Sequence, residues 1–227
     1  MKFIVFGLGN FGSALSEQLV RFGHEVIGVD ERMEKVDRFK NTVTHTIALD
    51  STNREAVAQL PVRDVDAVVI AIGENEGANI MTTALLKQMG ARRIISRITS
   101  HLQKVVLEAM DIREFSNPEV YSAERLAFKL DMPGILDSFP ITGGYRILEV
   151  TVPKRYEGQQ VKDLLLGSKF RLVLVSILKK TVHNNIFGTP SSDLRVMGVI
   201  AEDAVLEKGD VMLLFGTPKD LERFVEG

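Results

Sequence analysis

The feature that most constrains the fold is a glycine-rich stretch at residues 7–12, which reads Gly-Leu-Gly-Asn-Phe-Gly. The apolar run 3–6 precedes it, and a segment with apolar residues at helical spacing follows it. This order predicts a strand, a tight turn and the start of a helix. Gly7 allows the turn, Gly9 lets a pyrophosphate approach the backbone, and Gly12 lets the helix pack close to the strand. We therefore expect a phosphate-binding turn.

An acidic residue at the expected place supports this interpretation. Asp30 closes a second apolar run, residues 25–29, about 20 residues after the glycine stretch. A carboxylate at the end of the second strand can accept hydrogen bonds from ribose hydroxyls, and it repels a 2′-phosphate. The predicted ligand is therefore NAD(H), ATP, ADP or AMP rather than NADP(H). As an acid at a strand end, Asp30 is expected to make few packing contacts and to contribute little stability.

Strands and helices are expected to alternate through residues 1–116. Further apolar runs predict strands at 44–49, 67–72, 93–98 and near 112–115, with helical segments between them. This alternation is typical of α/β proteins with a Rossmann-like, doubly wound parallel sheet. Right-handed crossovers then place the ligand-facing turns along one edge of the sheet.

The pattern changes after residue 116. We interpret residues 117–142 as a connecting helical arm with more apolar residues than a lone helix needs, so a partner subunit is expected to cover it. Residues 143–227 form a small α+β unit in this interpretation. Its predicted elements are strands at 146–152, 172–178 and 211–215, a short helix at 160–166, a long polar connection at 179–208 in which 194–205 can add one or two strands, and a closing helix from 218.

Several polar and glycine residues follow the predicted strands, where ligands bind in open α/β sheets. Two short groups among them, residues 50–52 and residues 71–73, could each instead cap a helix. Asp50 or Ser51 is suited to the N-cap of the helix that begins near residue 53. Arg97 can grip phosphate oxygens through two donors, although an exposed arginine at a strand end is common. The candidate ligand-binding residues are Gly7, Gly9, Asn10, Phe11, Gly12, Asp30, Asp50, Ser51, Thr52, Ala71, Ile72, Gly73 and Arg97.

Composition excludes several classes of protein. A formal net charge of −2 over 227 residues gives no general electrostatic reason to bind nucleic acid. The absence of cysteine excludes disulfides, a thiolate nucleophile and zinc–thiolate sites. No apolar run approaches the length of a membrane span, and no signal-peptide pattern opens the sequence. We therefore expect a cytoplasmic protein.

Catalytic chemistry has little support in the sequence. The four histidines form no metal-binding or triad pattern. A dehydrogenase normally needs a substrate domain and a positioned proton donor or acceptor, and the second unit offers neither. Glu119 could coordinate a cation bound to phosphates, or it could be a first-turn acid favoured by the helix dipole. A binding module therefore explains the sequence better than the alternative, an NAD-dependent oxidoreductase.

Taken together and in order, these motifs resemble the RCK proteins, the regulators of potassium conductance. The resemblance is to the cytoplasmic TrkA/KtrA-type subunits of bacterial Trk and Ktr potassium uptake systems, and it covers nearly the whole chain. It rests on the glycine stretch, on Asp30, and on the segments 50–52, 71–73, 90–97 and 206–210.

The resemblance implies an RCK N-lobe, a crossover helix at about 119–130 and a TrkA-C-like domain. It also implies a non-enzymatic gate that binds adenine nucleotide, either ATP/ADP or NAD(H), and changes shape to control potassium flux. Homodimers would assemble into a ring, usually an octamer, beneath a TrkH/KtrB-like membrane potassium-translocating subunit at the inner face of the membrane. A nucleotide sensor for another transporter is the remaining alternative.

Individual residues carry over from the resemblance as well. Glu119 matches a glutamate near the phosphates and a divalent or monovalent cation at the dimer interface, and Arg97 matches a basic residue that faces the phosphates. Asn10 replaces an arginine of KtrA-like members, which removes a charge that senses the γ-phosphate. Gly167 lies near an arginine position that some members use for cyclic di-AMP, so we do not expect that ligand.

Overall fold

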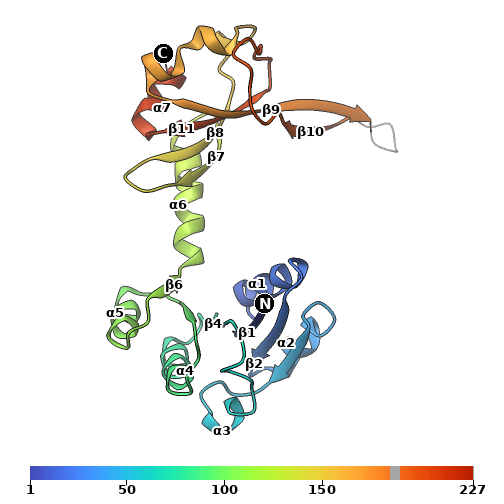
Figure 1. Ribbon diagram of the computed structural model, residues 1–227, viewed down its shortest axis with the longest axis vertical. Coiled ribbons are helices and arrows are strands. Elements are labelled where there is room, and N and C mark those ends of the chain that lie inside the picture. The colour runs from blue at the N-terminus through green and yellow to red at the C-terminus, as the bar shows by residue number, and fades with distance from the viewer. Residues whose placement is uncertain (185–189, 227) are drawn as a thin grey trace. The chain divides into compact units, whose positions relative to one another are not determined.

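The computed structural model describes residues 1–184 and 190–226 (Figure 1). The chain divides into two compact units, Met1–Val120 and Tyr121–Gly227, which are described in turn. The sequence predicts domain boundaries after residues 116 and 142. The structure divides into two compact units at one place, inside the helix that follows the first sheet.

The first unit is a parallel six-stranded sheet in the order β3-β2-β1-β4-β5-β6. Its strands are β1 (Lys2–Phe6), β2 (Glu25–Asp30), β3 (His45–Ala48), β4 (Ala67–Ile70), β5 (Ile94–Arg97) and β6 (Glu114–Ser116). The helices between them are α1 (Asn10–Arg21), α2 (Met33–Phe39), α3 (Arg54–Val57), α4 (Glu76–Gln88) and α5 (His101–Ala109). The predicted doubly wound α/β class is confirmed.

Both faces of this sheet are covered, which explains its apolar strands. All four residues of β4 are buried, as expected for a parallel strand between two helical layers. Side chains alternate along β1: Ile4 and Phe6 pack into one apolar cluster, and Val5 packs into another. The two clusters hold helices against opposite faces and fix the strand ends where the candidate residues lie.

The second unit contains an antiparallel five-stranded sheet in the order β10-β9-β11-β8-β7. After α6 (Pro118–Asp131) come β7 (Ile135–Pro140), β8 (Arg146–Thr151), β9 (Val173–Asn184), β10 (Pro190–Val196), β11 (Val211–Gly216) and α7 (Pro218–Glu226). Leu221 and Phe224 of α7 are buried, and the Phe224 ring stacks on Tyr156 with centroids 4.7 Å apart. This aromatic contact anchors the closing helix on the core.

The polar segment after residue 178 was predicted to be a connection, and this is wrong where the structure describes it. β9 continues to Asn184, and β10 pairs with it from Pro190↔Asn184 to Val196↔Leu178. Only the start of the predicted 194–205 strand region lies in β10, and residues 185–189 lie outside the described residues. Residues 179–193 are mostly polar and carry no regular alternation of apolar and polar residues, so periodicity misses these strands.

Two smaller predictions also differ from the structure. The predicted helix at 160–166 is a 3₁₀ turn, Val161–Leu164, followed by a π-helical turn, Leu166–Phe170, because Leu165 between them takes a left-handed conformation with φ of +50°. The helical part of the 117–142 arm ends at Asp131, and its apolar end is strand β7, which pairs with β8 in the second sheet.

Candidate functional site

The candidate site lies at the carboxyl edge of the first sheet, where β1 has β2 on one side and β4 on the other. The helices after β1 and β4 therefore leave in opposite directions, which makes this edge a topological switch point. The glycine turn after β1, Asp30 of β2, the turn after β4 and Arg97 of β5 all lie along it. Figure 1 shows β1, β2 and β4 side by side in this unit.

The glycine turn has the conformation that its sequence predicts. Gly7 has φ of +97°, which favours glycine, and its N–H donates to the Val29 carbonyl at 2.7 Å. A Cβ added to Gly12 would lie 1.8 Å from the Gly7 carbonyl oxygen and 2.9 Å from the Ala71 Cβ. The expected turn at Gly7 and the close helix–strand packing at Gly12 are confirmed.

Gly9 is less crowded than Gly7 and Gly12. A Cβ built there would have a single non-neighbouring atom within 4 Å among the described residues, the Lys35 Nζ at 3.9 Å. Gly9 is also the N-cap of α1, and the first intrahelical bond runs from Ser13 N to Gly9 O at 2.9 Å. The amides of Asn10 and Phe11 precede that bond, so they lie at the helix end that suits phosphate.

Asp30 connects the glycine turn to the next loop. Its Oδ2 accepts from the Leu8 amide at 2.8 Å, and its Oδ1 accepts from the Arg32 amide at 3.0 Å. The residue is only 8% exposed. The expectation that Asp30 makes few contacts is therefore wrong: it is a buried carboxylate with two backbone donors, and we now expect its replacement to cost stability. A carboxylate has about four acceptor sites, so two bonds leave room for ribose hydroxyls.

Two cations beside Asp30 were missed by the sequence analysis. The Lys35 Nζ lies 3.6 Å from Asp30 Oδ2, and the Arg32 Nε lies 3.8 Å from Asp30 Oδ1. Lys35 is in the first turn of α2, five residues after the strand-end acid. Basic residues just after the second strand were a visible signal, because that segment begins beside the predicted ribose site.

The guanidinium of Arg97 packs against the turn that follows β4. A Cβ on Gly73 would lie 2.5 Å from the Arg97 Cζ, so the guanidinium occupies the space above this glycine. An Arg97 Nη1 donor reaches the Ala71 carbonyl at 3.4 Å, and the Arg97 Cζ lies 5.8 Å from the centre of the Phe11 ring. Arg97 therefore contacts both the start of α1 and the turn that contains Ile72.

Glu119, at the start of α6, forms an ion pair with Arg97. Its side chain is 59% exposed. No group of three or more His, Cys, Asp or Glu side chains suited to a metal ion occurs within the described ranges. The arrangement brings Glu119 to the site edge through Arg97, and no second acid joins it in such a group.

A third missed residue, Asn79 of α4, fixes the turn that follows β4. Its Nδ2 donates to the Ile72 carbonyl at 2.9 Å and to the Arg97 carbonyl at 3.0 Å, while its Oδ1 accepts from Ser96 Oγ at 2.9 Å. Asn79 is fully buried. A polar residue on the buried side of a helix is the signal that could have identified it.

The residues after β3 form a separate polar turn at the same edge. Asp50 Oδ1 accepts from the Thr52 amide at 2.8 Å and from its hydroxyl at 2.7 Å. These bonds lower the pKa of Asp50, the side-chain bond most. Ser51 Oγ lies 2.8 Å from Thr82 Oγ1 of α4. Neither Asp50 nor Ser51 caps α3, because Asn53 does so by accepting from two amides.

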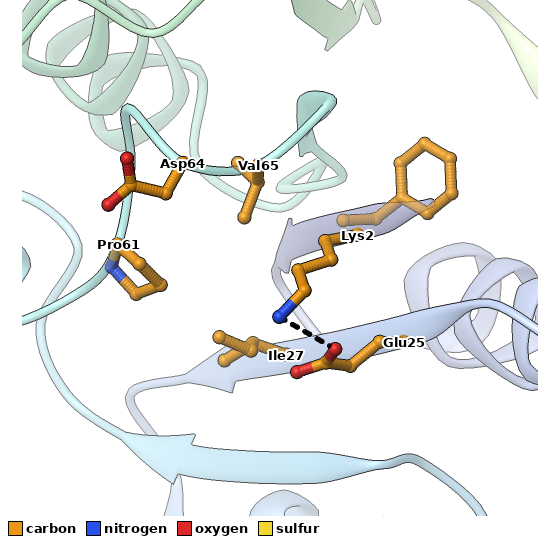
Figure 2. A pocket seen from close by; sticks show the side chains of 7 residues that line it. Lys2, Glu25, Ile27, Pro61, Asp64 and Val65 are labelled. Atoms are coloured by element: carbon orange, nitrogen blue, oxygen red, sulfur yellow. Dashed lines mark ion pairs between the residues drawn. The ribbon is translucent and has the colours of Figure 1, made fainter.

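A small pocket lies at the opposite, amino edge of the same sheet (Figure 2). Lys2 and Glu25 begin β1 and β2 there and form an ion pair of 3.0 Å. Pro61, Asp64 and Val65 close it from the loop before β4. Ligands of open α/β sheets bind at the carboxyl ends, so this pocket is not the candidate site.

Known proteins resemble this chain both in its first unit alone and over nearly its whole length. The TrkA-N domain family matches residues 3–118. The chain is 27% identical to Ktr system potassium uptake protein A of Bacillus subtilis over 223 residues. This match covers 98% of this chain and 95% of that relative. Over 165 residues it is 31% identical to Ktr system potassium uptake protein A of Vibrio alginolyticus, covering 73% and 75%.

Among solved structures, the chain is similar to the GsuK channel bound to NAD, with a TM-score of 0.64 and 13% identity over 99% of this chain and 39% of that one. At this identity the likeness shows the fold alone. Within the described residues, no helix is both long enough and apolar enough to span a bilayer.

Proposed function

This chain belongs to the TrkA-N domain family, and from that premise we propose that it is the cytoplasmic gating subunit of a potassium uptake system. Nucleotide bound at the glycine-turn edge shifts the protein between two shapes, and the membrane subunit responds. Such a ligand can shift the equilibrium only by its difference in affinity for the two shapes.

The observation that carries this proposal is the extent of the similarity. It spans 98% of the chain and 95% of the B. subtilis uptake protein, so it includes the second unit as well as the nucleotide-binding fold. A shared Rossmann-like fold alone would fit many enzymes. Similarity through both units favours a regulator over an oxidoreductase.

The proposed ligand is an adenine nucleotide, ATP/ADP or NAD(H). Its phosphates lie over Gly9 at the start of α1, and its ribose hydroxyls donate to Asp30, whose remaining acceptor sites suit them. The adenine lies toward the turns at residues 50–52 and 71–73. Arg97 faces the phosphates, and a cation near Glu119 is part of the same proposal, with the Arg97–Glu119 pair opening to admit it.

The proposed assembly is a homodimer that builds a ring, an octamer in the full form, on a membrane potassium-translocating subunit. Helix α6 supports it, because none of its 14 described residues is buried in the single chain. Tyr121, Leu126 and Leu130 of this helix are 60%, 56% and 76% exposed. Burying these side chains against a second copy removes apolar surface from water.

The first test is calorimetric titration of the purified protein with ATP, ADP, NADH and NADPH. The second is growth at limiting potassium of a strain from which the gene for this protein has been deleted. We expect at least one of the first three ligands to bind, weaker binding of NADPH, and impaired growth that the intact gene restores. Absence of binding by all four ligands, or unimpaired growth, contradicts the proposal. Turnover of NADH with a small substrate would establish the oxidoreductase instead.

A further inference from the structure

Lys35 occupies a position between the two halves of the proposed nucleotide site. Its Nζ lies 3.9 Å from where a Cβ of Gly9 would be, and 3.6 Å from Asp30 Oδ2. The side chain is 23% exposed, and its ammonium group borders the space above Gly9. A positive charge there faces whatever fills that space.

Asp30 leaves most of the hydrogen-bonding capacity of Lys35 unused. The carboxylate already accepts from the amides of Leu8 and Arg32 at 2.8 and 3.0 Å. At 3.6 Å, Lys35 is farther from Asp30 than the 2.7–2.9 Å or so of a charge-assisted hydrogen bond. An ammonium group has three donors, so donors remain for a ligand.

The placement of Lys35 in its own helix also argues against a purely structural role. It lies in the first turn of α2, where the helix dipole disfavours a positive charge. Asp30 is held by the backbone without it. A phosphate over Gly9 would instead be attracted by both Lys35 and the start of α1.

We propose that Lys35 donates to the 5′-phosphate that lies on Gly9, and that it makes this site select 5′-phosphorylated adenosine over adenosine itself. The inference rests on the proposed function, because it assumes an adenine nucleotide at this edge. It adds the side chain that recognises the phosphate next to the ribose, a role distinct from that of Arg97 on the β5 side.

The test compares adenosine, 5′-AMP and 2′-AMP by calorimetric titration. The variants are Lys35→Met, which removes the charge, and Lys35→Arg, which keeps it. Lys40→Met is the matched control, because Lys40 directly follows α2, is 59% exposed and pairs with Asp37. Thermal unfolding without ligand checks the fold, and Lys35→Gln replaces Lys35→Met if that variant does not fold.

We expect Lys35→Met to weaken 5′-AMP binding about tenfold or more and to leave adenosine binding unchanged. Lys35→Arg should retain most of the affinity, and Lys40→Met should match the wild type. Equal losses for adenosine and 5′-AMP, a loss confined to 2′-AMP, or no loss would each overturn the inference. If the wild type binds none of the three, the inference fails, and the titration with ATP, ADP, NADH and NADPH decides whether the proposed nucleotide function fails with it; if it binds 5′-AMP and Lys35→Met is unaltered, the inference alone fails.

Discussion

Each of the two units contains a buried aspartate that faces a lysine, and the two pairs differ in what the lysine contacts. In the first unit, Asp30 Oδ2 accepts from the Leu8 amide at 2.8 Å, with the Lys35 Nζ 3.6 Å away. In the second, Asp210 Oδ2 accepts from the Glu207 amide at 2.8 Å, with the Lys179 Nζ at 2.7 Å.

The two lysines differ in how many acceptors their ammonium groups contact. Lys179 also reaches Glu207 at 3.2 Å and the Val205 carbonyl at 3.0 Å, so it has three acceptors. Burial by itself would lower the pKa of Lys179, but hydrogen bonds to Asp210 and Glu207 outweigh burial and raise it. Lys179 is thus a structural cation that ties β9 to the turn before β11, whereas Lys35 keeps donors for a ligand.

The largest expected effect comes from Asp210→Asn, which removes the buried carboxylate and leaves Lys179 with the exposed Glu207 carboxylate and the Val205 carbonyl. We expect a loss of about 3 kcal/mol in the unfolding free energy of the second unit, since breaking a buried pair strands its partner. Chemical denaturation measures it. Glu207→Gln is the control and should cost less than about 1 kcal/mol, because that side chain is 70% exposed. Equal losses in the two variants would contradict the comparison.

Asp30→Asn comes next, at about 2 kcal/mol, because the Leu8 and Arg32 amides donate to different carboxylate oxygens, and in asparagine an NH2 group replaces one of these acceptors. Unlike Asp210→Asn, it should also weaken adenine nucleotide binding. Denaturation without ligand and calorimetric titration with ligand separate the two effects. A variant with unchanged unfolding would show that these backbone bonds add nothing in solution.

The lysines themselves give smaller effects. Lys179→Met should cost about 1–2 kcal/mol, because Asp210 keeps its charge and, within the described residues, a single backbone donor to its carboxylate, the Glu207 amide. Lys35→Met should cost under about 0.5 kcal/mol, since Asp30 retains both backbone donors. Parallel denaturation of the two variants without ligand measures the difference. Similar losses would mean that Lys35 is as structural as Lys179.

The smallest effect is a pH dependence in the alkaline range. The pKa of Lys179 is raised above 10.5 in the folded protein, so its stabilisation is fully present below 10.5. As the pH rises further, the unfolded chain loses its proton first, and stability falls until the pH passes the raised folded pKa. Unfolding free energy measured against pH should fall less steeply there for Lys179→Met than for the wild type.

The glycine turn was predictable because its requirements are local. Gly7 needs a positive φ and Gly12 needs the absence of a Cβ, and the residue type alone reports both. Alternating apolar runs likewise predicted the parallel sheet, since β1 and β4 are buried on both faces. The structural role of Asp30 was not predictable, because its two amide donors come from loops that meet only in the folded protein.

The missed residues share that dependence on three-dimensional contact. The position of Lys35 just after the second strand is visible in the sequence, but only the packing of α2 places its ammonium group beside Gly9. Asn79 looks like an ordinary polar helix residue until the carbonyls of Ile72 and Arg97 converge on it. The pairing of β9 with β10 escaped detection because the polar sequence there carries no regular apolar alternation, and the pairing itself exists only in the folded protein.

The contact at Gly12 has a genetic consequence. The obstacle to any larger residue there is a main-chain carbonyl oxygen, the one on Gly7, 1.8 Å from the position of a Cβ. Replacing a neighbouring side chain can enlarge a cavity, but it leaves the main-chain atom in place. A selection for revertants of Gly12→Ala should therefore return the original codon rather than compensating changes elsewhere in the gene.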